Sequence, residues 1–166
     1  MKIKSILFSS LFLLIQINTM SQINYTVEFK NPENHYCHVT VDFTAKQDNP
    51  VVGMPVWAPG SYLVREFSKS MEQLKSNAEF KKIRKNQWQL KAKKGDKCSF
   101  SYAIYGNEVS VRTNMIDESH AFLSPTATFV YIKGQETDGH KVKVILPQGW
   151  SKVACGLQET ANSLSF

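Results

Sequence analysis

The chain has 166 residues, with 20 Lys and Arg against 14 Asp and Glu, and a formal net charge of +6. This length favours one domain that can bury a sizeable core. The positive excess is modest and lies mostly at residues 81–94, where only Phe80 and Trp88 could interleave with it, so no nucleic-acid-binding face is expected.

Residues 1–21 are predicted to be a secretory signal peptide. Lys2 and Lys4 precede an apolar run at residues 6–17, and a short candidate cleavage region ends at Ser21. The run is too short to span a bilayer, and no Cys follows it that could carry a lipid. We therefore expect an exported protein, periplasmic or extracellular, without a stable membrane anchor, whose β-domain occupies residues 22–166.

The first half of the mature chain alternates apolar and polar residues in the manner of half-buried strands. Tyr25, Val27 and Phe29 predict one strand, and residues 36–45 predict another with the clearest alternation in the chain. A turn at residues 47–50 separates them from an extended segment at residues 51–57.

The next stretch, residues 54–67, contains a predicted tight turn. Pro59 fixes its own φ and Gly60 permits a positive φ, so residues 58–61 should reverse the chain. Trp57 and Tyr62 flank the turn, and we expect the two rings to clamp it against a sheet.

Short strands dominate the rest of the pattern. Residues 66–74 fit a turn of helix or an irregular connection, and residues 80–84 and 87–91 fit a lysine-rich hairpin at a solvated sheet edge. Further strands are predicted at residues 98–105, 109–113, 129–132, 142–146 and 150–157, with a loop at residues 114–125. Together, these strand and turn patterns predict an all-β, antiparallel β-sandwich of about nine or ten short strands.

Three cysteines allow at most one disulfide in an exported chain. Cys37 and Cys98 alternate with apolar residues of two predicted strands. They are expected to be buried free thiols that pack as small hydrophobic side chains.

The turn segment also resembles a known signature. Trp57 to Tyr62 read W-A-P-G-S-Y, and Arg65, Glu66 and Phe67 follow. This is similar to the W-x-P-G-S-Y-x-x-R-[DE]-[FY] motif of the N-terminal domain of the PDZ-containing glycyl aminopeptidases, with Ala58 where Thr is expected. A second, less specific block agrees in the same order: Ser110, Val111, Arg112, Thr113, Asp117, Phe122, Leu123, Leu146, Pro147, Gly149 and Trp150.

This resemblance implies a metallopeptidase with a following zinc-bearing catalytic domain and a PDZ domain, both missing from this sequence. The β-domain would pack on the catalytic domain and shape a cleft for a peptide substrate. No zinc is implied in this chain itself. The candidate substrate-facing residues are those of the motif: Trp57, Pro59, Gly60, Ser61, Tyr62 and Arg65.

The sequence contains no strong pattern for a catalytic or metal-binding site. His-Glu-x-x-His, which places two metal ligands on one helix face, is absent. His35 and His38 would point to opposite faces of a strand, and the adjacent Asp117, Ser119 and His120 lack the convergence of a triad. Neither catalysis nor metal binding is expected from them.

Two interpretations of the turn remain open at this stage. Tyr62 and Arg65 could line a peptide cleft, with Arg65 as a fixed cation for a carboxylate. Alternatively, the turn could be a packed corner with Arg65 paired to Glu66 or a neighbouring acid. For the whole chain, the alternative to the peptidase domain is a free-standing exported β-sandwich that binds a glycan or peptide through exposed aromatic residues such as Trp57, Trp88 and Trp150.

Overall fold

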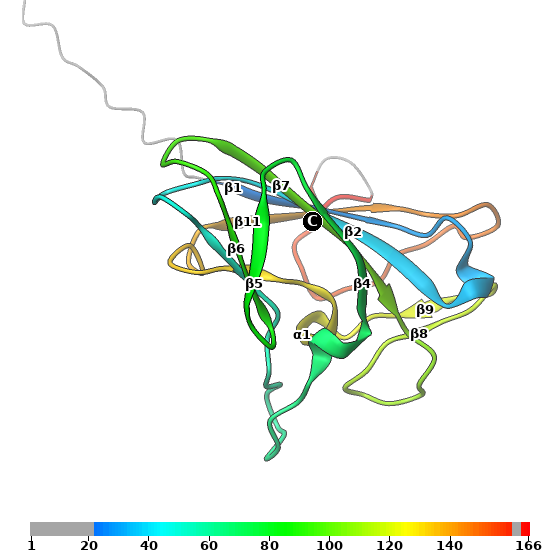
Figure 1. Cartoon of the computed structure of the whole chain (residues 1–166). Coiled ribbons are helices and arrows are strands. Elements are labelled where there is room, and N and C mark those ends of the chain that lie inside the picture. Colours follow the sequence, from blue (N-terminus) through cyan, green and yellow to red (C-terminus); the bar gives the residue numbers. More distant parts are fainter. Residues whose placement is uncertain (1–21, 161–163) are drawn as a thin grey trace, which may run out of the picture.

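The computed structural model describes residues 22–160 and 164–166, so the predicted signal peptide lies outside the described residues. Within that part of the chain, eleven strands form two large sheets and one small ribbon (Figure 1). They are joined by two 3-10 turns, η1 (Pro32–Asn34) and η2 (Phe67–Ser70), and one short helix, α1 (Pro125–Thr128). The predicted all-β fold is confirmed.

The larger sheet has the strand order β11-β1-β2-β7-β4. Its long central pair, β2 and β7, is antiparallel and pairs Val39 with Tyr102, whereas β1 and β11 run parallel. The strand bounds are Gln22–Glu28 (β1), Tyr36–Thr44 (β2), Met71–Ser76 (β4), Lys97–Tyr105 (β7) and Gly139–Ile145 (β11). The outer edge of β11 is partly covered, because Val142 exchanges two backbone hydrogen bonds with Phe166.

The smaller sheet has the order β10-β3-β6-β5. Its strands are Val51–Gly53 (β3), Phe80–Arg84 (β5), Gln87–Leu90 (β6) and Tyr131–Ile132 (β10). The predicted hairpin around Lys85 and Asn86 is confirmed as β5 and β6. A two-stranded ribbon pairs β8 (Met115–Ile116) with β9 (Ala121–Phe122) inside the segment expected to be a loop.

The core lies between the two sheets and follows from the period-two pattern. Alternate residues of β2 and β7, such as Val41 and Phe100, are fully buried, and Val52 and Leu90 of the smaller sheet are buried with them in one apolar cluster. Burying a side chain of this size contributes about 1.5–3 kcal/mol relative to leaving it in water. Burial of these alternating apolar side chains is therefore the main favourable contribution to folding.

Two buried tyrosines tie the segment around α1 to the larger sheet. Tyr25 donates a 2.9 Å hydrogen bond to the carbonyl oxygen of Val130, and Tyr102 donates one of 2.9 Å to that of Thr128. The Tyr102 hydroxyl also accepts from the Val130 amide. These bonds fix the position of the chain that leads from β9 into β10.

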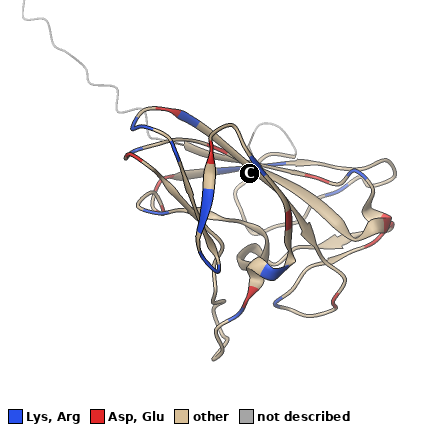
Figure 2. Cartoon of the chain, in the orientation of Figure 1, with Lys and Arg blue, Asp and Glu red and all other residues tan. Residues whose placement is uncertain are grey.

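The lysine-rich hairpin lies at the edge of the smaller sheet, as predicted. β5 is an edge strand, and the blue of Lys and Arg residues marks parts of this hairpin in Figure 2. Lys82 places its Nζ 5.4 Å from the centroid of the Trp88 ring, so one lysine covers the aromatic side chain behind it. A charged edge of this kind discourages pairing with the strands of another molecule.

The cysteine predictions hold for Cys37 and Cys98, which are buried free thiols, and Cys155 is free and exposed. Burial raises the pKa of the Cys37 thiol to about 12. Among the residues that the structure describes, no helix has the length and apolarity to cross a membrane.

Two predicted strands and one predicted extended segment need correction. β3 ends at Gly53 instead of residue 57, and neither residues 109–113 nor residues 150–157 form a strand. Val109 and Val111 both face solvent, and no strand in residues 22–160 and 164–166 pairs with them. Trp150 instead packs its ring on Phe29 at a centroid distance of 4.9 Å and donates a 3.0 Å hydrogen bond to the carbonyl oxygen of Glu118.

Candidate functional site: a projecting arm

The predicted turn forms the tip of an arm, residues 56–65, that projects from the sandwich at the bottom of Figure 1. Met54 anchors its start: the residue is fully buried, its amide donates to the carbonyl oxygen of Asn86, and the Asn86 side chain returns a 2.6 Å hydrogen bond. At the other end, the Arg65 amide donates a 2.6 Å bond to the carbonyl oxygen of Val56. The chain therefore leaves the smaller sheet and comes back on itself.

The tip has the geometry of a type II turn. Gly60 has a φ of 79°, and the Ser61 amide donates a 3.1 Å hydrogen bond to the carbonyl oxygen of Ala58. Pro59 stands at the position where a fixed φ is favourable, and Gly60 where a side chain would be strained. The predicted turn is confirmed at residues 58–61.

Ser61 organises the interior of the arm. It is buried, its carbonyl oxygen accepts a 2.6 Å hydrogen bond from the Trp57 indole, and its Oγ accepts bonds of 3.4 Å from the Leu63 amide and from Arg65 Nη2. Ser61 thus connects three residues of the arm, Trp57 through its carbonyl oxygen and Leu63 and Arg65 through its hydroxyl.

The expected clamp of aromatic rings against a sheet is wrong. Tyr62 is fully exposed and Trp57 is 52% exposed, with the Trp57 indole bonded inside the arm. Leu63 and Val64 are also 61% and 77% exposed. The sequence reasoning missed these two residues, although three consecutive apolar side chains directly after a turn, with no predicted partner strand, were a usable signal.

Arg65 is not paired with Glu66, so this pairing, which the packed-corner interpretation offered, is wrong. Glu66 instead accepts a 2.8 Å hydrogen bond from Lys85, which lowers the pKa of the Glu66 carboxyl. The Arg65 Nε is buried and has no hydrogen-bond partner within residues 22–160 and 164–166. The guanidinium is therefore held beside Ser61 with hydrogen-bonding capacity left over.

A second projection is the loop at residues 107–113. It exposes Val109 and Val111 and also carries Arg112. Its base is joined to the base of the arm, because α1, which follows this loop and the small ribbon, contacts η2, which follows the arm. Both blocks of the sequence motif therefore contribute exposed apolar residues at one end of the domain.

The base of this loop is fixed by a buried amide that the sequence reasoning also missed. Asn114 Oδ1 accepts a 2.8 Å hydrogen bond from the Ser124 amide and one of 3.2 Å from the Thr128 hydroxyl. Its Nδ2 donates a 3.3 Å bond to the carbonyl oxygen of Ala127. A polar residue in a predicted loop gave no indication that it is buried.

The candidate reactive groups have local structural partners. His35 holds its Nδ1 2.6 Å from the carbonyl oxygen of Ile116, and no three His, Cys, Asp or Glu side chains of the described residues are grouped to hold a metal. In the turn between β8 and β9, the Ser119 hydroxyl donates to Asp117 Oδ1 at 2.7 Å. This bond lowers the pKa of the Asp117 carboxyl to about 2, together with hydrogen bonds from the backbone amides of His120 and Ser119. Asp117 therefore stabilises an exposed turn.

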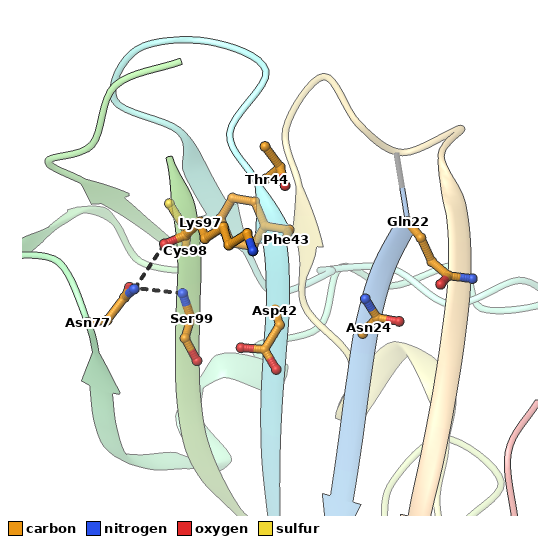
Figure 3. Close-up of a pocket in the computed structure, with 9 residues that line it drawn as sticks. All are labelled: Gln22, Asn24, Asp42, Phe43, Thr44, Asn77, Lys97, Cys98 and Ser99. Atoms are coloured by element: carbon orange, nitrogen blue, oxygen red, sulfur yellow. Dashed lines mark hydrogen bonds between the residues drawn. The ribbon is translucent and has the colours of Figure 1, made fainter. Parts of the chain in front are cut away.

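One shallow cavity lies on the outer face of the larger sheet (Figure 3). It has a volume of about 370 Å³, and Figure 3 shows Asn24 and Asp42 on neighbouring strands at its floor. Asn77 is fully engaged there, donating to the carbonyl oxygen of Lys97 and accepting from the Ser99 amide. None of the residues predicted for the site lines this cavity, so the site and the cavity are separate.

The proposed surface of three exposed tryptophans is not formed. Trp88 is buried in the core, and Trp150 is occupied by Phe29 and Glu118. Trp57 alone among these three is mostly exposed.

Residues 24–166 match the family model of the peptidase M61 N-terminal domain. The chain belongs to this family. The resemblance to the glycyl aminopeptidases, drawn from the motif around the arm, is thereby confirmed. The comparison with curated proteins gives no match.

One solved structure of an aminopeptidase shares the fold, and a second was compared with it. An aminopeptidase N family protein from Idiomarina loihiensis superposes with a TM-score of 0.74 at 24% identity, over 87% of this chain and 26% of that chain. An M1 zinc metallopeptidase from Deinococcus radiodurans, solved with a Tyr-Ser-Ala substrate, gives 0.42 at 12% identity over 88% of this chain and 37% of that one. The M61 N-terminal domain described here thus spans about a quarter of the first relative.

Zinc belongs to the metallopeptidases of this family, but the donor set of this domain does not fit it. A catalytic zinc site needs three converging nitrogen, oxygen or sulfur ligands and an open position. The described residues contain no such group, and His35 is already bonded to a backbone oxygen.

Proposed function

We propose that this chain is the non-catalytic N-terminal β-domain of an exported zinc metallo-aminopeptidase of the glycyl aminopeptidase type. It packs on a catalytic domain and shapes the substrate cleft of that domain, with a PDZ domain as a further part of the same protein. The observation that carries the proposal is the arm: the family's motif residues lie on a projection whose apolar side chains face solvent. A projection of this kind can reach a neighbouring domain's cleft.

In this proposal, Tyr62 and Arg65 face the peptide substrate. Tyr62 offers an exposed ring and hydroxyl, and Arg65 offers a cation that the Ser61 hydroxyl holds in position. Trp57, Pro59, Gly60 and Ser61 keep the arm in shape through the turn and the indole hydrogen bond. These residues position a substrate and break no bond themselves.

The test is to express the complete open reading frame and to measure hydrolysis of amino-acid anilides with and without a chelator. We expect hydrolysis by the complete protein, loss of hydrolysis with the chelator, and no hydrolysis by residues 22–166 with added zinc. Turnover by residues 22–166 alone, abolished by changing one of their side chains, would overturn the proposal. An inactive complete protein would do the same.

The role of the arm is tested in the complete protein by Tyr62→Phe and Arg65→Ala. We expect both variants to raise KM for peptide substrates while the thermal unfolding temperature stays unchanged. Arg84→Ala, which changes an exposed arginine on the β5 edge strand, is the matched control. Kinetic constants equal to those of the parent in both arm variants would remove Tyr62 and Arg65 from the substrate cleft.

A further inference from the structure

The outer face of the larger sheet carries a line of polar side chains that crosses all five strands. In the register of the sheet, Lys143 of β11 lies beside Thr26 of β1, and Thr26 lies beside Thr40 of β2. Thr40 lies beside Ser101 of β7, and Ser101 lies beside Lys75 of β4. Residues paired in this way point to the same face of a sheet. The line, named here the hydroxyl row, thus consists of three hydroxyl groups with a lysine at each end.

The hydroxyl row has hydrogen-bonding capacity that the domain itself does not use. None of its five side chains has a hydrogen-bond or ion-pair partner within residues 22–160 and 164–166. The three hydroxyl-bearing residues are half-buried. Each hydroxyl can donate one hydrogen bond and accept two, and each lysine ammonium can donate three. The row is therefore equipped to bind a ligand that carries hydroxyl and anionic groups.

Two cavities flank the hydroxyl row on this face. The cavity of Figure 3, of about 370 Å³, includes Asn24, Asp42 and Ser99, which form the next row across β1, β2 and β7. The second cavity, of about 420 Å³, is lined by Asn31, Asn34, Tyr36, His38 and Gln73. β2 runs from the second cavity past Thr40 into the first, and its residues 36 and 42 are roughly 20 Å apart at about 3.3 Å per residue. The flanked row is long enough to hold several units of a linear polymer.

The unpaired charges of this face are mostly positive. The outward lysines without an ion-pair partner in the described part of the chain are Lys75, Lys97, Lys141 and Lys143. Of the outward carboxylates on the described strands of this sheet, Glu28 is paired with Lys30, and Glu72 accepts a hydrogen bond from Tyr36. Asp42 is the carboxylate left unpaired. An anionic ligand therefore matches the face better than a neutral one.

The other side chains of the face favour a sugar polymer among anionic ligands. Amides and hydroxyls can both donate to and accept from the hydroxyl groups of a sugar. Asp42 can accept from sugar hydroxyls, whereas it would repel a continuous phosphate backbone. Tyr36 and the 41% exposed Tyr105 lie with their ring centroids 5.2 Å apart, and such rings offer an apolar surface to one side of a sugar ring.

We propose that the outer face of the larger sheet binds a linear acidic polysaccharide, over the hydroxyl row and into the two cavities beside it. The hydroxyl groups of the polysaccharide exchange hydrogen bonds with Thr40 and Ser101, and its carboxylates approach Lys75 and Lys143. This binding is independent of the peptidase role, because no residue of the arm lines either cavity.

The test measures binding of the complete protein to fluorescein-labelled oligosaccharides by fluorescence polarisation. The acidic probes are fragments of alginate, polygalacturonate and hyaluronate, and a dextran fragment is the neutral reference. We expect at least one acidic probe to bind about tenfold more tightly than dextran, and added salt to weaken that binding. Binding to none of the three would overturn the proposal, and this is also the result expected if another domain or a second copy covers the face.

Charge variants separate the face from a general attraction to basic proteins. Lys75→Gln with Lys143→Gln should raise Kd for the acidic probe about tenfold. Lys81→Gln with Arg84→Gln on the β5 edge removes the same charge elsewhere and should change Kd by less than about twofold. Equal losses in the two double variants would show non-specific attraction and overturn the proposal.

Thr40→Val tests the hydroxyl row at constant charge. The change keeps the shape of the side chain and removes the central hydroxyl, so Kd should rise about fivefold, as expected for one lost hydrogen bond. The thermal unfolding temperature should not fall. An unchanged Kd would contradict the hydroxyl row. A labelled DNA duplex of equal charge should bind more weakly than the acidic oligosaccharide; equal or tighter binding would assign the face to polyanions in general and overturn the sugar.

Discussion

The indole of Trp57 donates a 2.6 Å hydrogen bond to the carbonyl oxygen of Ser61, so the two residues that bracket the Pro59 and Gly60 turn are joined. Trp57 is therefore a structural residue of the arm although half of it faces water. The bond closes the tip independently of the backbone bonds at the base.

We expect Trp57→Phe to loosen the arm without weakening the domain. The change removes one hydrogen bond worth about 1 kcal/mol and no core contact, so the Ser61 and Arg65 amides should exchange roughly fivefold faster. The urea midpoint should stay unchanged. Hydrogen exchange followed by mass spectrometry measures this, with Val64→Ala as the control, and unchanged exchange at both amides would show that the indole does not hold the tip.

Gly53→Ala should destabilise the smaller sheet. A Cβ at this position would lie 2.5 Å from Cζ of the Tyr131 ring on the paired strand β10, and backbone or ring must move to admit it. The expected cost is about 1–3 kcal/mol in the free energy of unfolding, measured by urea denaturation.

The cost should be smaller in a Tyr131→Ala background, since the ring that collides is then gone. Gly156→Ala is the matched control, because a Cβ there meets nothing within 4 Å. Equal costs in the two backgrounds would locate the strain away from Tyr131.

Asn114→Ala should destabilise the base of the second loop. Its side chain satisfies the Ser124 amide and the Ala127 carbonyl oxygen, and alanine leaves both without this partner in a buried site. The Thr128 hydroxyl keeps its 2.8 Å hydrogen bond to the carbonyl oxygen of Ser124. Leaving buried polar groups unpaired gives an expected loss of at least about 2 kcal/mol in urea denaturation. Asn107→Ala, at an exposed position of the same loop, should lower the free energy of unfolding much less. Equal losses in the two variants would contradict a buried hydrogen-bond network around Asn114.

Stability should fall in alkaline solution through Cys37. Burial raises the pKa of its thiol from 9.0 to about 12, whereas in the unfolded chain the thiol ionises near 9. The buried, neutral Cys37 thiol therefore makes its full contribution to the free energy of unfolding below pH 9. This contribution is lost as pH rises from 9 to about 12, at about 1.4 kcal/mol per pH unit.

Cys37→Ala should remove this part of the dependence of the free energy of unfolding on pH, although its smaller side chain lowers the stability at neutral pH. Above pH 10 the variant should still lose stability through Tyr25, because burial raises the pKa of its hydroxyl to about 12. Urea denaturation at intervals across this pH range measures both. A variant whose slope between pH 9 and 10 equals that of the parent would exclude Cys37 as the titrating group.

The three thiols should differ in reactivity. In the native protein Cys155 should react with a thiol reagent at once, and Cys37 and Cys98 slowly, because the first is exposed and the other two are buried. In denaturant all three should react. A count of one thiol in denaturant would demonstrate a disulfide and contradict the free cysteines.

The strands that the sequence predicted well are those that bury one face. In β2 and β7 every second residue enters the core, so the apolar alternation is enforced by burial and could be read directly. The hairpin of β5 and β6 could also be predicted from the sequence, because a polar pair at Lys85 and Asn86 separates two short strands. The turn at residues 58–61 followed from proline and glycine chemistry alone.

The exposure of Val109 and Val111 could not be predicted, because apolar alternation indicates a strand but does not supply a partner strand. Val109 and Val111 alternate with polar residues as those of β2 do, yet no strand among the described residues pairs with them and both face water. Likewise, no local pattern distinguishes an aromatic ring that clamps a turn from one that is left exposed, as Tyr62 is. Those outcomes depend on tertiary neighbours, and in our proposal on a second domain.

The register that joins Gln22 to Gly139 bears on how the domain folds. β1 gains its second neighbour only when a segment far along the chain has emerged, and pairings of such long sequence separation are slow because the intervening loop must close first. A nascent chain on the ribosome would thus expose the outer side of β1 until β11 arrives. Chaperone binding to the early part of the chain during synthesis is the expected consequence.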